Sequence, residues 1–163
     1  MSPEITSFSD IDHLPTSEAP EPPRMKMSHD LPPMLDAIRA NGMDPVVEKT
    51  CFTYGDVIYN PGKLNVPPDM FAHEETHSFQ QGGNPAGWWS RYLTDQWFRI
   101  DQEVEAFAVQ YVWYGQHVSH DRNARARFLF KLSALLAAPT YGSVIGSIAA
   151  QRMIQAAAGK VRL

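Results

Sequence analysis

The stretch PPDMFAHEETHSFQQGG, residues 67–83, decides how the rest of the sequence is interpreted. Prolines fit the first turn of a helix and paired glycines end one, so this stretch predicts one helix from Pro67 to about Gln81. Within it, residues 73–77 have the form H-E-x-x-H. A spacing of four residues places His73 and His77 on one face of the helix, one turn apart.

Two imidazoles in this arrangement can bind one Zn²⁺ ion, with nitrogen–zinc distances of ~2.0–2.1 Å. Glu74 would then project beside the open coordination position. There it can take a proton from zinc-activated water and pass it to a leaving amine. We therefore expect a zinc-dependent hydrolase that cleaves a peptide or amide bond, with His73 and His77 as metal ligands and Glu74 as the general base.

A catalytic zinc site needs a third protein ligand and leaves the fourth position for water. No further histidine follows the motif closely, which argues against the metzincin arrangement. The helix expected over residues 100–117 carries three acids, Asp101, Glu103 and Glu105. That helix is apolar on nearly every side and should be buried, and a buried carboxylate is costly unless it is paired or binds a metal. Helical geometry alone does not choose among the three acids.

This pair of motifs resembles that of gluzincin-type metallopeptidases, in which an H-E-x-x-H helix is complemented by a downstream glutamate in an E-x-x-A-like context. The matching stretch is residues 103–106, so the resemblance implies Glu103, 26 residues beyond His77, as the third ligand. The wider pattern from Cys51 to Gln110 is similar to small zinc-peptidase-like proteins of phages and prophages. The resemblance implies a zincin-like fold, Zn²⁺ as the cofactor, and a peptide or protein substrate that it does not identify.

Gln102 departs from the gluzincin pattern. The larger gluzincins carry an asparagine before the third-ligand glutamate, whereas Gln102 stands there in this chain. Tyr141, in the break between two expected helices, has a hydroxyl that could stabilise a developing oxyanion, although a turn tyrosine packed on the core is the simpler interpretation. We interpret the remaining aromatic cluster as core packing: Trp88, Trp89, Tyr92, Trp97 and Phe98.

The chain divides by composition into a tail and a domain. Residues 1–33 hold seven of the thirteen prolines and, with six acids against two bases, the whole net charge of −4. We predict a disordered proline-rich tail there and a mainly helical (α+β) domain over residues 34–163. Strand formers between Val46 and Asn60 predict a small hairpin that turns at Gly55-Asp56. Besides the motif helix, we expect helices near residues 34–40, from 85 onward, and over 100–117, 122–138 and 143–158.

Composition also excludes several classes of protein. Residues 34–163 hold twelve acids and twelve bases, so we expect no nucleic-acid partner. The one cysteine, Cys51, excludes disulfide scaffolds. Without a visible secretory signal we expect a cytoplasmic location, with virion association as the alternative. The stretch from Leu132 to Ala150 is free of charge for 19 residues, but residues 139–143 interrupt it and favour two short helices over a membrane span.

Two alternatives to a zinc peptidase follow from the same residues. The first is a phage virion or accessory protein with a structural or vestigial zinc site, no catalysis, and a virion or host protein as its partner. Four protein ligands or a sealed site would favour it. The second is a membrane- or partner-binding module built on residues 122–158, in which the motif would be incidental.

Overall fold

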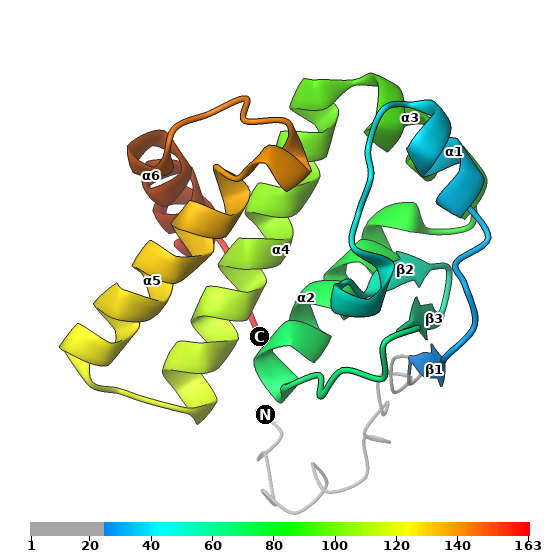
Figure 1. The fold of residues 1–163 in the computed structure, drawn as a ribbon. Coiled ribbons are helices and arrows are strands. Elements are labelled where there is room, and N and C mark those ends of the chain that lie inside the picture. Colours follow the sequence, from blue (N-terminus) through cyan, green and yellow to red (C-terminus); the bar gives the residue numbers. More distant parts are fainter. Residues whose placement is uncertain (1–24) are drawn as a thin grey trace, which may run out of the picture.

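The structure is a computed structural model that describes residues 25–163; residues 1–24, drawn in grey in Figure 1, lie outside the described part. The prediction of a mainly helical protein with a small sheet is confirmed. In chain order the elements are β1 (Lys26–Ser28), α1 (Leu35–Ala40), η1 (Val47–Lys49), β2 (Phe52–Tyr54), β3 (Val57–Tyr59), α2 (Pro68–Gln81), α3 (Pro85–Thr94), α4 (Gln96–His117), α5 (Arg122–Leu136), η2 (Pro139–Tyr141) and α6 (Ser147–Ala158). The η elements are short 3₁₀-helices.

The predicted hairpin is present, although it is shorter than the run of strand formers. β2 and β3 pair antiparallel, and Gly55 takes the positive φ, 61°, that a tight turn between strands favours. Val47–Lys49, which we expected among the strand formers, forms η1 instead. The backbone of Glu48 lies against Gly62 so closely that no side chain would fit at position 62.

The N-terminal tail ends earlier than residue 33. β1 pairs parallel with β3 along the edge that β2 leaves free. Lys26 Nζ lies 2.9 Å from Asp56 Oδ2, and Met25 is buried under the sheet. The predicted boundary is therefore wrong for residues 25–33, because a three-residue strand needs only an open edge, not a long apolar pattern. The rest of the predicted tail, residues 1–24, lies outside the described residues.

The helices around the motif begin and end at the predicted signals. α2 follows Pro67 and ends before Gly82, whose φ is 52°. Asn84 caps α3, since its side-chain oxygen accepts a hydrogen bond of 2.9 Å from the backbone N–H of Gly87.

Two helices begin at other residues than predicted. α4 begins four residues earlier, at Gln96, because the carboxylate of Asp95 accepts hydrogen bonds from two backbone N–H groups of its first turn. α6 begins at Ser147 and not at Ser143. Gly142 and Ser143 take positive φ values of 92° and 52°, so the chain cannot continue as a right-handed helix there.

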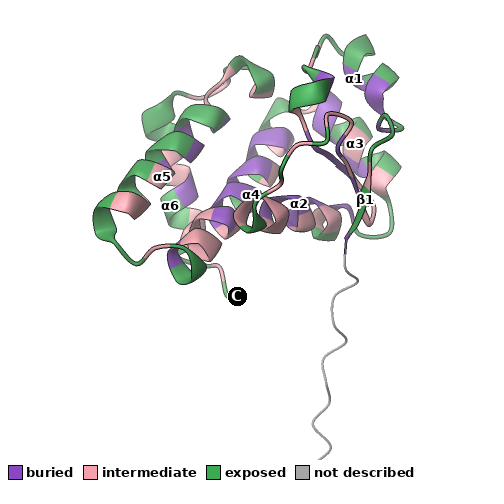
Figure 2. Cartoon of the chain, turned by 60° about the horizontal axis from the view of Figure 1, so that its bottom comes forward, coloured by how far each residue is buried: buried purple, intermediate pink, exposed green. Residues whose placement is uncertain are grey.

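α4 is the central element of the fold. It packs against α2 and α3 on one side and against α5 and α6 on the other (Figure 1), and much of its length is buried (Figure 2). The largest core cluster joins α4, α5 and α6 through Ile100, Val104, Phe107, Ala108, Leu129, Leu132, Leu136, Ala150 and Ile154. Because α2 and α4 lie side by side, the H-E-x-x-H motif faces the acid-bearing part of α4.

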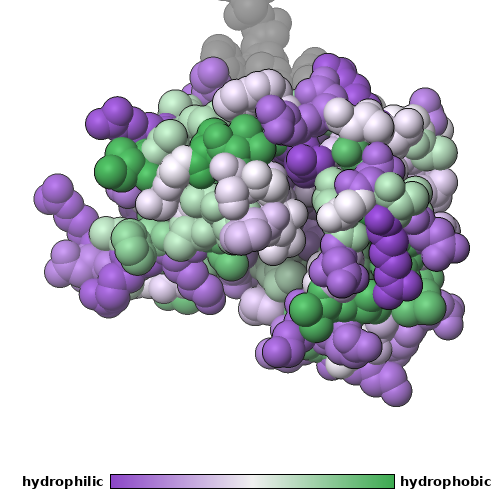
Figure 3. All heavy atoms as spheres, turned by 45° about the horizontal axis from the view of Figure 1, so that its top comes forward, coloured by the Kyte–Doolittle hydropathy of each residue, from purple (hydrophilic) through white to green (hydrophobic). Residues whose placement is uncertain are grey.

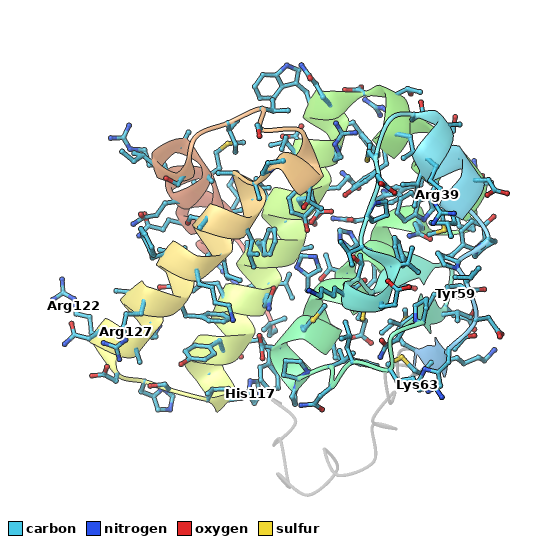
Figure 4. The ribbon with its side chains drawn as sticks, viewed as in Figure 1. Arg39, Tyr59, Lys63, His117, Arg122 and Arg127 are labelled. Atoms are coloured by element: carbon cyan, nitrogen blue, oxygen red, sulfur yellow. The ribbon has the colours of Figure 1, made fainter. Side chains whose placement is uncertain are left out.

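The C-terminal helices divide the uncharged stretch as expected. It is split between α5 and α6, and no helix within residues 25–163 combines the length and hydrophobicity that crossing a membrane requires. Arg122 and Arg127, near the start of α5, are exposed and their side chains point away from the rest of the molecule (Figure 4). This is the arrangement of a solvated helix face.

Candidate metal centre

His73 and His77 lie on the buried face of α2, as their spacing predicts. Both residues are buried, and their Nε2 atoms are 3.1 Å apart. The ring of His73 also packs edge-to-face on Phe107 of α4, with the ring centroids 4.6 Å apart. The helix period and this packing therefore direct both Nε2 atoms to one point.

Glu103 supplies the third group at that point. It is 2% exposed, and its Oε2 and Oε1 atoms lie 3.4 Å from the Nε2 atoms of His73 and His77 respectively. The two distances are to different oxygens of the carboxylate, and the three ligand atoms, one from each residue, lie within 4.8 Å of one another. The three side chains thus form a buried cluster of two imidazoles and one carboxylate that could hold a metal ion.

The other two acids considered for the third position lie elsewhere. Asp101 and Glu105 are exposed on α4, and neither belongs to the cluster of metal-ligating groups found among the described residues. Glu105 instead accepts a hydrogen bond of 2.9 Å from the amide of Gln80. Of the three acids, only Glu103 faces the two histidines.

The charges in the cluster stabilise one another. Burial, the largest single effect, would lower the pKa of His77, but the charge of Glu103, the hydrogen bond to it, the charge of Glu74 and the hydrogen bond to Gln80 together outweigh burial and raise the pKa to about 9. Burial alone would raise the pKa of Glu103, yet the charge of His77 and hydrogen bonds from both histidines hold it well below its usual range. Glu103 is therefore an anion, the form that binds a metal.

A chain of hydrogen bonds orients His77. Its Nδ1 lies 2.8 Å from Oε1 of Gln80, and the amide nitrogen of Gln80 donates to the carbonyl of Gln102 and to Glu105. The side chain of Gln102 accepts a hydrogen bond from Trp88 Nε1. Gln102 therefore helps to fix α4 against α2 and α3.

Tyr92 is a functional candidate that the sequence did not indicate, because we interpreted it as core packing. Its hydroxyl donates a hydrogen bond of 2.6 Å to Glu103 Oε1. Burial and the charge of Glu103 raise the pKa of Tyr92 well above its usual value, which keeps the phenol protonated. The hydroxyl of a buried tyrosine usually has a hydrogen-bond partner. The position of Tyr92 among the aromatic residues of α3 could therefore have indicated a polar group nearby.

Glu74 lies beside the cluster and is held by β2. It is 5% exposed, and its Oε2 accepts a hydrogen bond of 2.7 Å from the hydroxyl of Thr53. Within residues 25–163, its Oε1 makes no hydrogen bond to protein. One oxygen is thus fixed while the other is available to a reactant.

These residues line a cavity of about 710 Å³. α2 and α4 form the wall that carries the cluster, and residues 41–53 and 139–142 form the facing walls. The space-filling view shows the surface hollowed between the side of the molecule with α5 and α6 and the side with α1 (Figure 3). A wider depression of about 900 Å³ runs past Phe71 and Trp113 but includes none of the three clustered side chains.

Tyr141 is placed at this cavity by η2. Its ring packs on Phe107 with the centroids 6.0 Å apart. Burial and then the charges of Glu103 and Glu74 raise the pKa of Tyr141 well above its usual value, so its hydroxyl is a proton-bearing donor. Tyr141 therefore lies in a position compatible with both interpretations, oxyanion stabiliser and core tyrosine.

Comparisons with known protein families, with characterised proteins and with solved structures give no match to this chain. The case for its function therefore rests on the geometry of the cluster and its cavity.

Proposed function

We propose that the protein is a zinc-dependent hydrolase, and specifically a metallopeptidase. The observation that carries the proposal is the convergence of two imidazoles and one carboxylate, from His73, His77 and Glu103, whose ligand atoms lie within 4.8 Å of one another, with Glu74 beside them on a cavity. The resemblance to gluzincins supports the same assignment. The donor set of two imidazoles and one carboxylate is that of catalytic zinc sites with an open position.

A zinc ion held by these three side chains would supply Lewis acidity towards water and towards a substrate carbonyl. Glu74, fixed through Thr53, takes the proton of the attacking water on its free oxygen and transfers it to the leaving nitrogen. Tyr141 donates a hydrogen bond to the oxygen on which charge develops. Tyr92 holds the carboxylate of Glu103 in its orientation.

The burial of the cluster favours a second candidate, a virion or accessory protein in which zinc only stabilises the fold. His73 and His77 are 6% and 7% exposed and Glu103 is 2% exposed, as the ligands of a closed structural site are. Structural zinc sites have four protein ligands, whereas the described residues offer three at this point. This difference favours the enzyme.

Metal analysis and one substitution test the proposal. Purified protein should contain zinc near one equivalent, and His73→Ala should lose it. Glu74→Gln should keep zinc but lose at least ~100-fold of peptidase activity on a mixed peptide library. If the purified protein contains no zinc, both candidate functions are wrong. If it binds zinc but shows no hydrolysis that depends on Glu74, only the structural zinc site remains.

A further inference from the structure

Arg99 is a buried cation on the wall of the same cavity. It is 7% exposed and lies four residues before Glu103 on α4, so both side chains leave the same face of the helix, one turn apart. Nη1 donates a hydrogen bond of 2.7 Å to the carbonyl oxygen of Tyr92. Nε is buried without a partner, and no acid among residues 25–163 forms an ion pair with this guanidinium.

The charge balance of the cavity leaves this cation uncompensated when a metal is bound. The charge of a divalent metal ion would balance the two carboxylates inside the cavity, those of Glu74 and Glu103. At the rim, Asp44 and Lys49 are exposed and opposite in charge. A buried charge without a counter-ion is destabilising. A guanidinium is best stabilised by a carboxylate that accepts two parallel hydrogen bonds from it, a bidentate pair.

The chain leaves space beside the guanidinium. A Cβ atom on Gly142 would lie 3.4 Å from Nη2 of Arg99, and with φ at 92° this position disfavours any side chain. The backbone after Tyr141 therefore passes the guanidinium without a side chain that would cover it. On the other side, the ring of Tyr92 lies 5.7 Å from the guanidinium carbon.

We propose that Arg99 binds a carboxylate of the substrate, so that the site selects peptides with a negative charge close to the reacting bond. The assignment of this ligand as a peptide substrate rests on the proposed function. Side chains four residues apart on a helix have their Cβ atoms ~5–6 Å from each other, and an extended peptide covers ~3.3–3.6 Å per residue. The carboxylate is thus one or two residues from the reacting carbonyl, and it is either the C-terminus of the peptide or an acidic side chain.

Binding of matched peptides to zinc-loaded Glu74→Gln protein tests the proposal without cleavage. The first pair is acetyl-Ala-Ala-Phe with a free carboxylate or with a C-terminal amide. The second pair is acetyl-Ala-Glu-Phe-amide and its glutamine counterpart. Calorimetric titration should show the charged member of one pair binding at least about tenfold more tightly, and that pair identifies the source of the carboxylate.

Substitution of Arg99 in the same background connects the preference to this residue. Arg99→Gln should abolish the preference and leave the affinity for the uncharged member unchanged. Arg99→Lys should keep part of the preference for the charged peptide, because an ammonium retains the charge but cannot form the bidentate pair. This variant also controls for a folding defect. Arg91→Gln is the matched control, since Arg91 lies on the exposed side of α3 and pairs with Asp95.

Equal affinity within both pairs, absence of binding by all four peptides, or a preference that survives Arg99→Gln would overturn the inference. The proposed function fails separately, through absence of zinc. If zinc is bound but no Glu74-dependent hydrolysis occurs, the same titrations still decide whether Arg99 binds a carboxylate, because Arg99 is not one of the clustered ligands.

Discussion

Gln80 fixes the protonation pattern of His77. Its amide nitrogen donates to the carbonyl of Gln102 and to Glu105, so its oxygen must be the atom that faces the imidazole. His77 therefore carries a hydrogen on Nδ1, so Nε2 is the ring nitrogen that a bound metal would take in place of a proton.

Gln80→Ala should weaken zinc binding by about 10–100-fold, the usual effect of losing a partner behind a ligand histidine. Competition with a chromophoric chelator measures the dissociation constant. Glu105→Gln is the control, because an amide at that exposed position can still accept the hydrogen bond from Gln80. Equal affinities of the two variants would remove Gln80 from the site.

Cys51, a further residue on the cavity wall, should be unreactive in the folded protein. Burial, with a contribution from the charge of Glu74, raises its pKa to about 11. At pH 8 only about one thiol in a thousand is then ionised, compared with about a quarter at the ordinary pKa of ~8.5. Labelling by iodoacetamide at pH 8 should therefore be at least ~100-fold slower in native protein than in 6 M guanidinium, and rapid native labelling would contradict this environment.

The sequence predicted the site residues that share one helix, but not those that meet only when different elements pack together. His73, Glu74 and His77 follow from the period of a single helix. Glu103 needed the resemblance, since periodicity left three acids open. Arg99 could not be predicted, because its role depends on which helix packs beside α4 and which loop lies above it.

At the scale of elements, Gln81 attaches the hairpin to the motif helix. Its side-chain oxygen accepts a hydrogen bond of 2.7 Å from the backbone N–H of Gly55, and its amide donates one of 2.8 Å to the carbonyl of Thr53. These bonds place β2 so that the hydroxyl of Thr53 reaches Glu74. The position of Glu74, the proposed general base, thus depends on how the hairpin docks on α2.

Gln81→Ala should lower the free energy of unfolding by about 1–2 kcal/mol, because it removes the hydrogen bond to the partly buried N–H of Gly55 and one of the two side-chain hydrogen bonds to the carbonyl of Thr53, which Trp89 also contacts. Urea denaturation followed by circular dichroism measures the change. Gln155→Ala, at an exposed position of α6, should stay within ~0.5 kcal/mol of the wild type. A loss for Gln81→Ala no larger than that of the control would show that the hairpin docks without this side chain.

The predicted helix boundaries held where proline, glycine or asparagine marks them, as at Pro67, Gly82 and Asn84. They shifted where Asp95 acted as an unrecognised cap. β1 was missed because its three residues become a strand only through pairing with β3, and the edge of another strand is not visible in local sequence.

At the scale of the whole molecule, the proposed ligands join α2 and α4, two helices that α3 separates along the chain. A metal held there binds the folded state and not the unfolded one, and at a thousand times its dissociation constant would add about 4.1 kcal/mol of stability. Chelation should therefore lower the melting temperature, and zinc should restore it.

Differential scanning calorimetry with and without chelator checks this effect. His73→Ala should melt at the same temperature with and without zinc. His117→Ala should keep the full zinc response, because His117 is exposed at the end of α4 (Figure 4) and its imidazole stacks on Trp113. A zinc response that survives in His73→Ala would place the stabilising metal elsewhere.

The connection from α5 to α6 contributes residues 139–142 to the cavity, although neither helix carries a proposed ligand. The width of the entrance therefore depends on how these two helices pack on α4, through contacts such as Leu132 with the core around Ile154. Substitutions in that packing would shift η2 while the ligand set stays in place. Changes in the packing of α5 and α6 would therefore alter which molecules enter the cavity and leave the three clustered side chains where they are.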